Sequence, residues 1–151
     1  MELTTNLEQL GLLARAIEIA VEAHKGQVDK AGEPYILHPL RIMHKLVSAT
    51  DRIVGVLHDV VEDSPDWTIE RLRKEGFGED VLVPLALLTK RKHESYLDSY
   101  IARVQGNMRA RRVKLADLSD NTDMLRLFLE SDLDMKRLQK YRKAIRILSF
   151  E

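Results

Sequence analysis

Four polar residues that could carry out metal or acid–base chemistry stand in and just after an apolar run. The segment Val56-Leu57-His58-Asp59-Val60-Val61-Glu62-Asp63 places a His-Asp pair among aliphatic side chains and follows it with two more acids. Burying unpaired polar groups is costly, so these four are expected to be paired or functional. On a helix, His58 and Glu62 would share one face, with Asp63 at its border. Such a pattern is suited to holding a hard metal ion and managing the proton of a water bound to it.

Two other segments place a ligand-type residue where the apolar pattern predicts burial. His38 follows an aliphatic pair, and Asp117 lies among aliphatic residues later in the chain. Two imidazoles and two carboxylates form a mixed nitrogen and oxygen donor set, which suits Mn²⁺, Fe²⁺ or Zn²⁺. Open coordination positions would hold water, whose pKa the metal lowers. Glu62 and Asp63 could then orient this water or accept its proton.

Each of these residues taken alone also has a purely structural interpretation. A buried histidine is commonly a hydrogen-bonded core residue, and an aspartate on a helix is commonly a cap or an ion-pair partner. The order His, His-Asp, Asp along one chain is a much stronger signal than any one of its parts.

The bulk composition indicates a single folded domain. The 151 residues are 44% hydrophobic and 32% charged, a globular balance with enough chain for a real core. Lys plus Arg equals Asp plus Glu at 24 each, which argues against a dedicated nucleic-acid binder. Cysteine is absent, so thiolate metal sites are excluded. The N-terminus does not have the pattern of a secretory signal, and no apolar run approaches the ~20 residues that span a bilayer. We therefore expect a cytoplasmic protein with no membrane partner.

Helical spacing of the apolar residues predicts an all-α fold of about eight or nine helices in one domain over residues 1–151. The first helix would turn a stripe of Leu7, Leu10, Ala14, Ile17 and Val21 inward, and Asp51 would cap the helix that follows it. No segment alternates with the period of two that marks a strand. The helices are expected at about residues 4–25, 39–47, 52–62, 68–74, 81–90, 94–105, 108–118, 121–129 and 134–150.

The motifs around the ligand-type residues resemble one family. The order His38, His58-Asp59, Asp117 is the pattern of the HD metal-dependent phosphohydrolase superfamily. The flanking segments resemble the hydrolase domain of Rel/SpoT-type alarmone enzymes from about residue 12 to about residue 130, so the chain looks like a stand-alone small alarmone hydrolase. These segments are Ala23-His24-Lys25-Gly26-Gln27, Lys30-Ala31-Gly32-Glu33-Pro34-Tyr35-Ile36, His38-Pro39-Leu40, the run from Leu57 to Asp63, Gly76-Phe77-Gly78, Leu88-Thr89-Lys90 and Val113-Lys114-Leu115-Ala116-Asp117 with Asn121.

This resemblance implies a metal centre and a reaction. The fold would be an all-α HD-domain bundle in which His38, His58, Asp59 and Asp117 hold one Mn²⁺ ion, with Fe²⁺, Zn²⁺ or Mg²⁺ as alternatives. The family reaction hydrolyses the 3′-diphosphate from a purine nucleotide such as ppGpp and releases pyrophosphate. Activation of water by a metal and neutralisation of phosphate oxygens by cations agree with this reaction.

The resemblance also implies roles for residues outside the ligand set. Glu62 and Asp63 match the pair thought to activate the attacking water. Asn121 matches a residue that contacts the sugar or phosphate region of the nucleotide, and Lys30 lies in the loop that borders the nucleotide pocket. We expect a nucleotide as the partner and a monomer or homodimer as the assembly.

The position before the loop lysine departs from the family pattern. That residue is usually basic and packs on guanine, whereas this chain has Asp29. A carboxylate cannot stack on a purine as a guanidinium does, although it could accept a hydrogen bond from an exocyclic amine. The stretch Leu118-Ser119-Asp120 also lacks the usual basic and histidine residues. Both ppGpp-like and ppApp-like alarmones are therefore candidate substrates.

Two other functions fit the same residues. An HD-type nucleotidase would release orthophosphate, and a catalytically silent regulator would bind the nucleotide without turnover. The glycine-containing loop and the Glu62-Asp63 pair favour the pyrophosphohydrolase over the nucleotidase. The presence of every ligand-type residue and both acids argues against the silent regulator.

Overall fold

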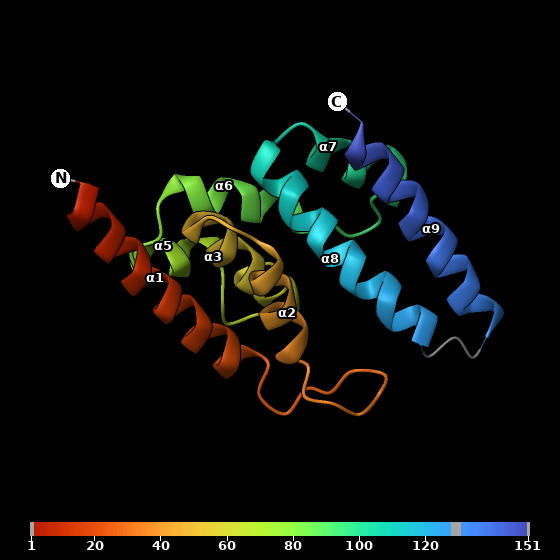
Figure 1. Ribbon diagram of the computed structural model, residues 1–151, viewed down its shortest axis with the longest axis horizontal. Helices are drawn as coiled ribbons and strands as arrows, with labels where there is room; N and C mark the ends of the chain where they lie inside the picture. Colours follow the sequence, from red (N-terminus) through yellow and green to blue (C-terminus); the bar gives the residue numbers. More distant parts are fainter. Residues whose placement is uncertain (1, 128–130, 151) are drawn as a thin grey trace.

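The chain folds into a bundle of helices, which confirms the all-α fold class (Figure 1). A computed structural model describes residues 2–127 and 131–150, and for residues 2–6 and 125–127 it describes the backbone alone. One π-helix, η1 (Tyr96–Ile101), accompanies the α-helices. These are α1 (Glu2–Ala23), α2 (Leu37–Lys45), α3 (Ala49–Leu57), α4 (Val60–Asp63), α5 (Ile69–Lys74), α6 (Glu79–Leu88), α7 (Ala102–Gln105), α8 (Met108–Leu127) and α9 (Asp132–Ser149). Across the described residues, none of the helices has the length and apolar character needed to cross a membrane.

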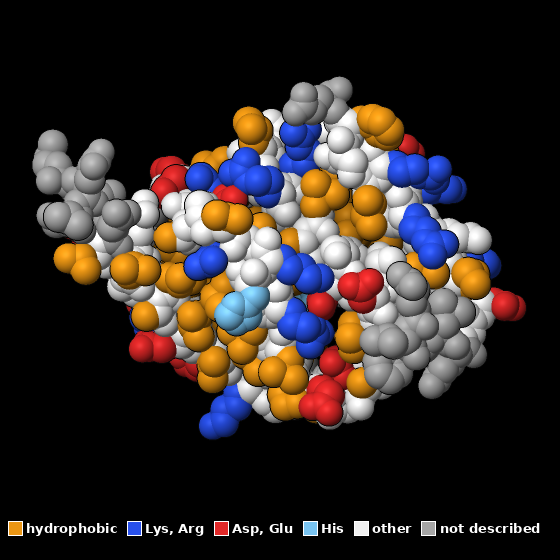
Figure 2. All heavy atoms as spheres, in the orientation of Figure 1, with side chains coloured by type: hydrophobic (Ala, Val, Ile, Leu, Met, Phe, Trp, Pro, Cys, Tyr) orange, Lys and Arg blue, Asp and Glu red, His pale blue; other side chains and the backbone are white. Residues whose placement is uncertain are grey.

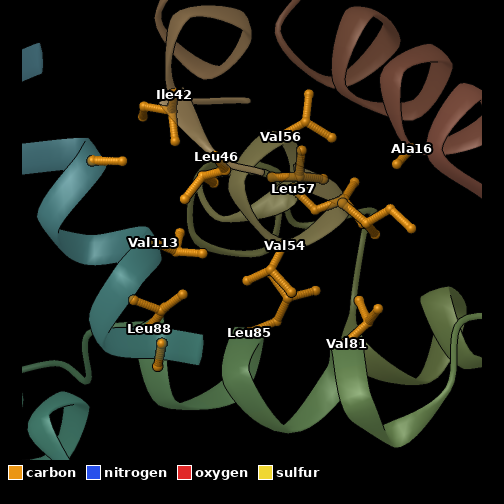
Figure 3. Close-up of a cluster of buried hydrophobic side chains, with 14 of the residues drawn as sticks. Ala16, Ile42, Leu46, Val54, Val56, Leu57, Val81, Leu85, Leu88 and Val113 are labelled. Carbon is orange, nitrogen blue, oxygen red and sulfur yellow. The ribbon is translucent and has the colours of Figure 1, made fainter. Parts of the chain in front are cut away.

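The core forms around α3, the helix that leads into His58. α1, α2, α6 and α8 all pack against α3. Figure 3 shows Leu46, which follows α2, together with Leu85 of α6 and Val113 of α8, gathered around Val54 of α3. Burying one aliphatic side chain of this kind stabilises a fold by about 1.5–3 kcal/mol. The α3 side chains that are at most 1% exposed are Ile53, Val54, Val56 and Leu57. This helix is therefore a firm base for the polar residues that follow it.

Gly55 allows α2 to lie close to α3. A Cβ atom at this position would lie 2.7 Å from Leu46 Cδ1 and 3.2 Å from Ile42 Cγ2, closer than carbon atoms normally approach. α2 carries His38 and α3 leads into His58, so the close packing at Gly55 brings together the two helices that present the histidines.

α8 and α9 run side by side along one edge of the bundle (Figure 1). α8 is continuous from Met108 to Leu127, whereas the apolar spacing predicted two helices with a break near residue 120. The prediction is wrong because Asp120 and Asn121 bond to other side chains instead of competing for the local backbone. The predicted end of the second helix at Leu129 lies outside the described residues.

The face of α1 that packs on the core differs from the predicted one. Leu7 and Leu10 of the predicted stripe are 69% and 58% exposed, whereas Ala16, Ile19 and Ala20 are fully buried. α1 therefore has apolar residues on two adjacent faces. The face with small alanine side chains packs against α3, because small residues let the two backbones approach each other.

The predicted cap of α3 is also wrong. Ser48 is the N-cap residue, and its Oγ accepts the backbone N–H of Asp51 at 3.1 Å. Asp51 is instead buried in the first turn, where Arg109 and Arg112 pair with its carboxylate. These ion pairs join the start of α8 to α3.

Candidate metal centre

The His58-Asp59 pair lies in a turn between two helices rather than inside one. α3 ends at Leu57 and α4 begins at Val60, so the helix predicted over residues 52–62 is interrupted. The imidazole takes part in this interruption, because His58 Nδ1 donates to the Gly55 carbonyl oxygen at 2.7 Å. This bond fixes the ring and leaves Nε2 for a different partner.

The four predicted metal-ligating residues converge from three segments of the chain. One donor atom each of His38, His58 and Asp117 lies within 4.8 Å of the other two. His38 Nε2 and His58 Nε2 lie 3.0 Å and 3.4 Å from the same oxygen, Asp117 Oδ1. Asp59 completes the group, with oxygens 3.2 Å from His58 Nε2 and 3.7 Å from His38 Nε2. The group joins α2, the α3–α4 turn and α8.

The carboxylates and imidazoles of this group shift one another's pKa values. Burial lowers the pKa of His58, but the charges of Asp59 and Asp117 outweigh burial and hold it well above its ordinary value. Burial raises the pKa of Asp59, yet the neighbouring imidazole of His58 brings it to about 2. Lys114 and His58 likewise hold the pKa of Asp117 well below its usual range. Two ionised carboxylates side by side favour a positive charge between them.

This donor set fits a divalent cation. His58 Nε2 is buried and, although oxygens of Asp59 and Asp117 lie 3.2 Å and 3.4 Å away, it makes no hydrogen bond of acceptable geometry among the described residues, whereas buried ring nitrogens normally make one. Two imidazole nitrogens and two carboxylates are donors that divalent transition-metal ions accept. Such an ion would balance the charges of Asp59 and Asp117 and would give His58 Nε2 a partner.

Three neighbouring side chains fix the directions of these carboxylates. Tyr35 donates its hydroxyl to Asp59 Oδ2 at 2.6 Å. Lys114 Nζ donates to Asp117 Oδ2 at 2.8 Å, and Asn121 Nδ2 donates to Asp117 Oδ1 at 3.2 Å. Partners of this kind orient metal ligands and are as much a part of a metal site as the ligands themselves.

Asp120 and Arg41 belong to the site although sequence reasoning did not assign them to it. Asp120 Oδ2 lies 2.6 Å from His38 Nδ1, and Arg41 Nε donates to Asp120 Oδ1 at 2.8 Å. The available signal was position, because Asp120 follows Asp117 by three residues and shares its helix face.

Glu62 and Asp63 lie on α4, one turn beyond the His-Asp pair, and both side chains reach the surface. Partial desolvation and the negative charge of Asp59 raise the pKa of both carboxyls. At Asp63, the neighbouring His24 and the Gln27 amide act in the opposite direction. Accessible carboxyls with raised pKa values suit proton transfer at a site of this kind.

A solvent-open pocket of about 180 Å³ adjoins His38. The predicted substrate residues Asp29, Lys30 and Asn121 all line this pocket. Arg137 and Tyr141 of α9 line it too, and sequence reasoning did not assign either residue to a site. The available signal was Tyr141, an aromatic residue among the charged side chains of this helix.

The loop that carries Asp29 and Lys30 is tied to its surroundings. Asp29 Oδ1 accepts the backbone N–H groups of Ala31 and Glu33 at 2.8 Å and 3.0 Å, which closes a tight turn. Lys30 pairs through Nζ with Asp134 in the first turn of α9. The loop and α9 therefore form one wall of the pocket.

A family model for the HD domain matches residues 16–144, a span that contains all four candidate ligands. The chain belongs to the HD domain family.

Curated relatives extend this result. A guanosine-3′,5′-bis(diphosphate) 3′-pyrophosphohydrolase from Aquifex aeolicus is 37% identical over 130 residues, which cover 78% of this chain and 18% of the relative. The protein of the same name from Haemophilus influenzae is 35% identical over 72% of this chain and 17% of its own length. The predicted resemblance to the hydrolase domain of Rel/SpoT-type enzymes is confirmed, and the chain spans less than a fifth of the length of these relatives.

A solved structure shares the fold. It is described as a metazoan ortholog of SpoT that hydrolyses ppGpp and plays a role in starvation responses. Its TM-score is 0.76 at 23% sequence identity, and the match covers 91% of this chain and 85% of the other.

Proposed function

We propose that this protein is a metal-dependent hydrolase that removes the 3′-diphosphate from a purine nucleotide alarmone and releases pyrophosphate. The observation that carries the proposal is the convergence of His38, His58, Asp59 and Asp117 beside a pocket with basic side chains in its wall. The names of the relatives that are 37% and 35% identical to the chain support this substrate class.

In this proposal, His38, His58, Asp59 and Asp117 hold one Mn²⁺ ion. When bound, such an ion supplies a Lewis acid for the phosphate group and lowers the pKa of water. Glu62 and Asp63 accept the proton of the attacking water at a carboxylate oxygen, for which their raised pKa values suit them. One of the two carboxylates carries this proton and returns it to the 3′ oxygen as the bond between that oxygen and phosphorus breaks.

The pocket residues would bind and orient the nucleotide. Lys30, Arg41 and Arg137 supply cations for phosphate oxygens, and Asn121 has a second amide N–H for the sugar or phosphate region. Asp29 uses Oδ1 within its own loop, which would leave Oδ2 for an exocyclic amine of the base. Guanine and adenine both carry such an amine, so both kinds of alarmone belong in the test.

A hydrolysis panel tests this function directly. ppGpp, pppGpp, ppApp and pppApp are incubated with the Mn²⁺-loaded protein, and the products are identified by anion-exchange chromatography. We expect pyrophosphate from at least one of them. Release of orthophosphate alone would instead establish the nucleotidase, and binding without turnover would establish the regulator.

The metal, the location and the assembly are further parts of the proposal. Restoring activity to metal-free protein with Mn²⁺, Fe²⁺, Zn²⁺ or Mg²⁺ in turn tests the choice of Mn²⁺.

We propose a nucleotide as the only partner besides a second copy of the chain. We propose the cytoplasm, where nucleotides are made, as the location. On the face seen in Figure 2, basic and acidic side chains are interspersed, which supports the absence of a nucleic-acid partner. Light scattering distinguishes the monomer from the homodimer.

A further inference from the structure

A buried carboxylate stands behind the first of the two histidines. His38 turns Nε2 toward Asp117 at 3.0 Å and Nδ1 toward Asp120 Oδ2 at 2.6 Å. The Asp120 side chain is only 6% exposed. The two ring nitrogens of His38 therefore meet two different carboxylates, one inside the proposed ligand set and one outside it.

Asp120 is itself held firmly. Arg41 donates Nε to Oδ1 at 2.8 Å and Nη2 to Oδ2 at 3.0 Å, a two-pronged contact that fixes the plane of the carboxylate. Lys45 Nζ lies 3.8 Å from Oδ1. Asp120 therefore presents a fixed carboxylate acceptor to His38.

We propose that Asp120 is a positioning residue of the metal centre. It accepts the Nδ1–H of His38, selects the tautomer whose Nε2 carries the lone pair, and aims that lone pair at the position between Asp59 and Asp117. A carboxylate behind a ligating imidazole makes the ring a stronger donor, and losing such a partner typically weakens metal affinity by about 10–100-fold. The inference rests on the metal centre of the proposed function but not on its substrate.

A simpler role would be a helix-to-helix ion pair. Arg41 and His38 both lie on α2, and Asp120 lies on α8, so Asp120 could serve only to join these helices. That role predicts a loss of folding stability with no change in the metal affinity of the folded protein. The positioning role predicts a change in metal affinity and in the tautomer of His38.

The experiment uses Asp120→Ala, Asp120→Asn and a matched control, Asp123→Asn. Asp123 lies three residues further along α8 and is exposed, so its variant removes the same charge without touching His38. Metal-free proteins are titrated with Mn²⁺ by calorimetry in the absence of nucleotide. We expect the Kd for Mn²⁺ to rise about 10–100-fold in Asp120→Ala, to rise less in Asp120→Asn, and to stay unchanged in the control. If Asp120→Ala does not fold, the Kd for Mn²⁺ is measured in Asp120→Asn, which is neutral but isosteric with the wild-type side chain.

A second readout needs neither metal nor substrate. Nitrogen NMR of the metal-free protein at alkaline pH reports which ring nitrogen of His38 carries the proton. We expect Nδ1–H in the wild type and a shift toward Nε2–H in Asp120→Ala, because Asp117 Oδ1, 3.0 Å from Nε2, is then the remaining carboxylate acceptor. An unchanged tautomer together with a Mn²⁺ Kd within twofold of wild type would overturn the positioning role, even in an active alarmone hydrolase. Conversely, if the panel of alarmones is not hydrolysed but both readouts shift, the positioning role stands and the proposed substrate fails.

Discussion

Two clusters of buried charge lie along α8, and they differ in whether the protein's own side chains neutralise the buried carboxylates. Near the start of the helix, Asp51 receives Nε of Arg109 and Nε of Arg112, each at 2.7 Å. Burial raises the pKa of Asp51, but the two guanidinium groups outweigh it and lower the pKa. The carboxylate in this first cluster has its counter-charges within the protein.

Further along α8, the metal-centre cluster has a different balance. Asp59 and Asp117 face each other across two imidazoles, and Lys114 is the one lysine that pairs with Asp117 among the described residues. His58 Nε2 makes no hydrogen bond of acceptable geometry with any described residue. The Asp51 and Asp117 side chains are similarly buried, at 6% and 5% exposed, so the burial of a carboxylate does not distinguish a structural cluster from a binding site. The difference lies in whether each buried polar atom already has a partner.

The largest expected effect separates the two clusters outright. Asp59→Ala should lose bound Mn²⁺ and reduce hydrolysis by about a thousandfold or more, because the Lewis acid contributes several kcal/mol and each ~1.4 kcal/mol is tenfold in rate. Asp51→Ala, the matched change in the other cluster, should keep its metal. Elemental analysis and a rate assay measure both variants. Tight Mn²⁺ binding by Asp59→Ala would remove this residue from the ligand set.

The next effect separates metal binding from proton transfer. Glu62→Gln should keep Mn²⁺ and lower the turnover rate by about 10²–10⁴-fold, the usual contribution of a positioned acid or base. The metal content and kcat of the purified variant decide the matter. A fully active Glu62→Gln enzyme would refute the role given to this carboxylate.

A smaller effect concerns the stability of the Asp51 cluster. Asp51→Ala should lower the free energy of unfolding by about 2 kcal/mol, less than the ~3–5 kcal/mol typical of a fully buried pair. The reason is that the Arg109 and Arg112 side chains are 29% and 45% exposed, so water can solvate them once the carboxylate is gone. Urea unfolding monitored by circular dichroism gives this value. A loss of Mn²⁺ affinity in the same variant would contradict the separation of the two clusters.

The smallest effect is a dependence on pH. The pKa of Asp51 is lower in the folded protein than in the unfolded chain, where it is about 3.9. Its stabilisation is therefore complete above about pH 4 and is lost as the pH falls through the folded-state pKa. The difference in unfolding free energy between wild type and Asp51→Asn should stay constant from pH 7 to pH 5 and shrink in stronger acid. A difference that grows in acid would contradict this assignment.

These contrasts also show what the sequence could and could not predict. The spacing of apolar residues predicted the all-α fold. The order His38, His58-Asp59, Asp117 predicted which side chains would converge, because this order is the motif of the HD family. The partners of Asp51 lie 58 and 61 residues away, and no local pattern indicates a pairing over such a distance. Asp120 was missed for a similar reason, since its contacts with Arg41 and His38 join two helices far apart in the chain.

The convergence of His38 and Asp117 has a consequence for chain connectivity. These residues are separated by 79 positions, so one ion bound to both would close a loop of more than half the protein. Closing a loop of this length restricts the unfolded chain far more than a local contact does. In a protein without cysteine, the ion would cross-link α2 and α8 as a disulfide would, and its removal should lower the free energy of unfolding while the packing of α8 on α2 and α3 remains.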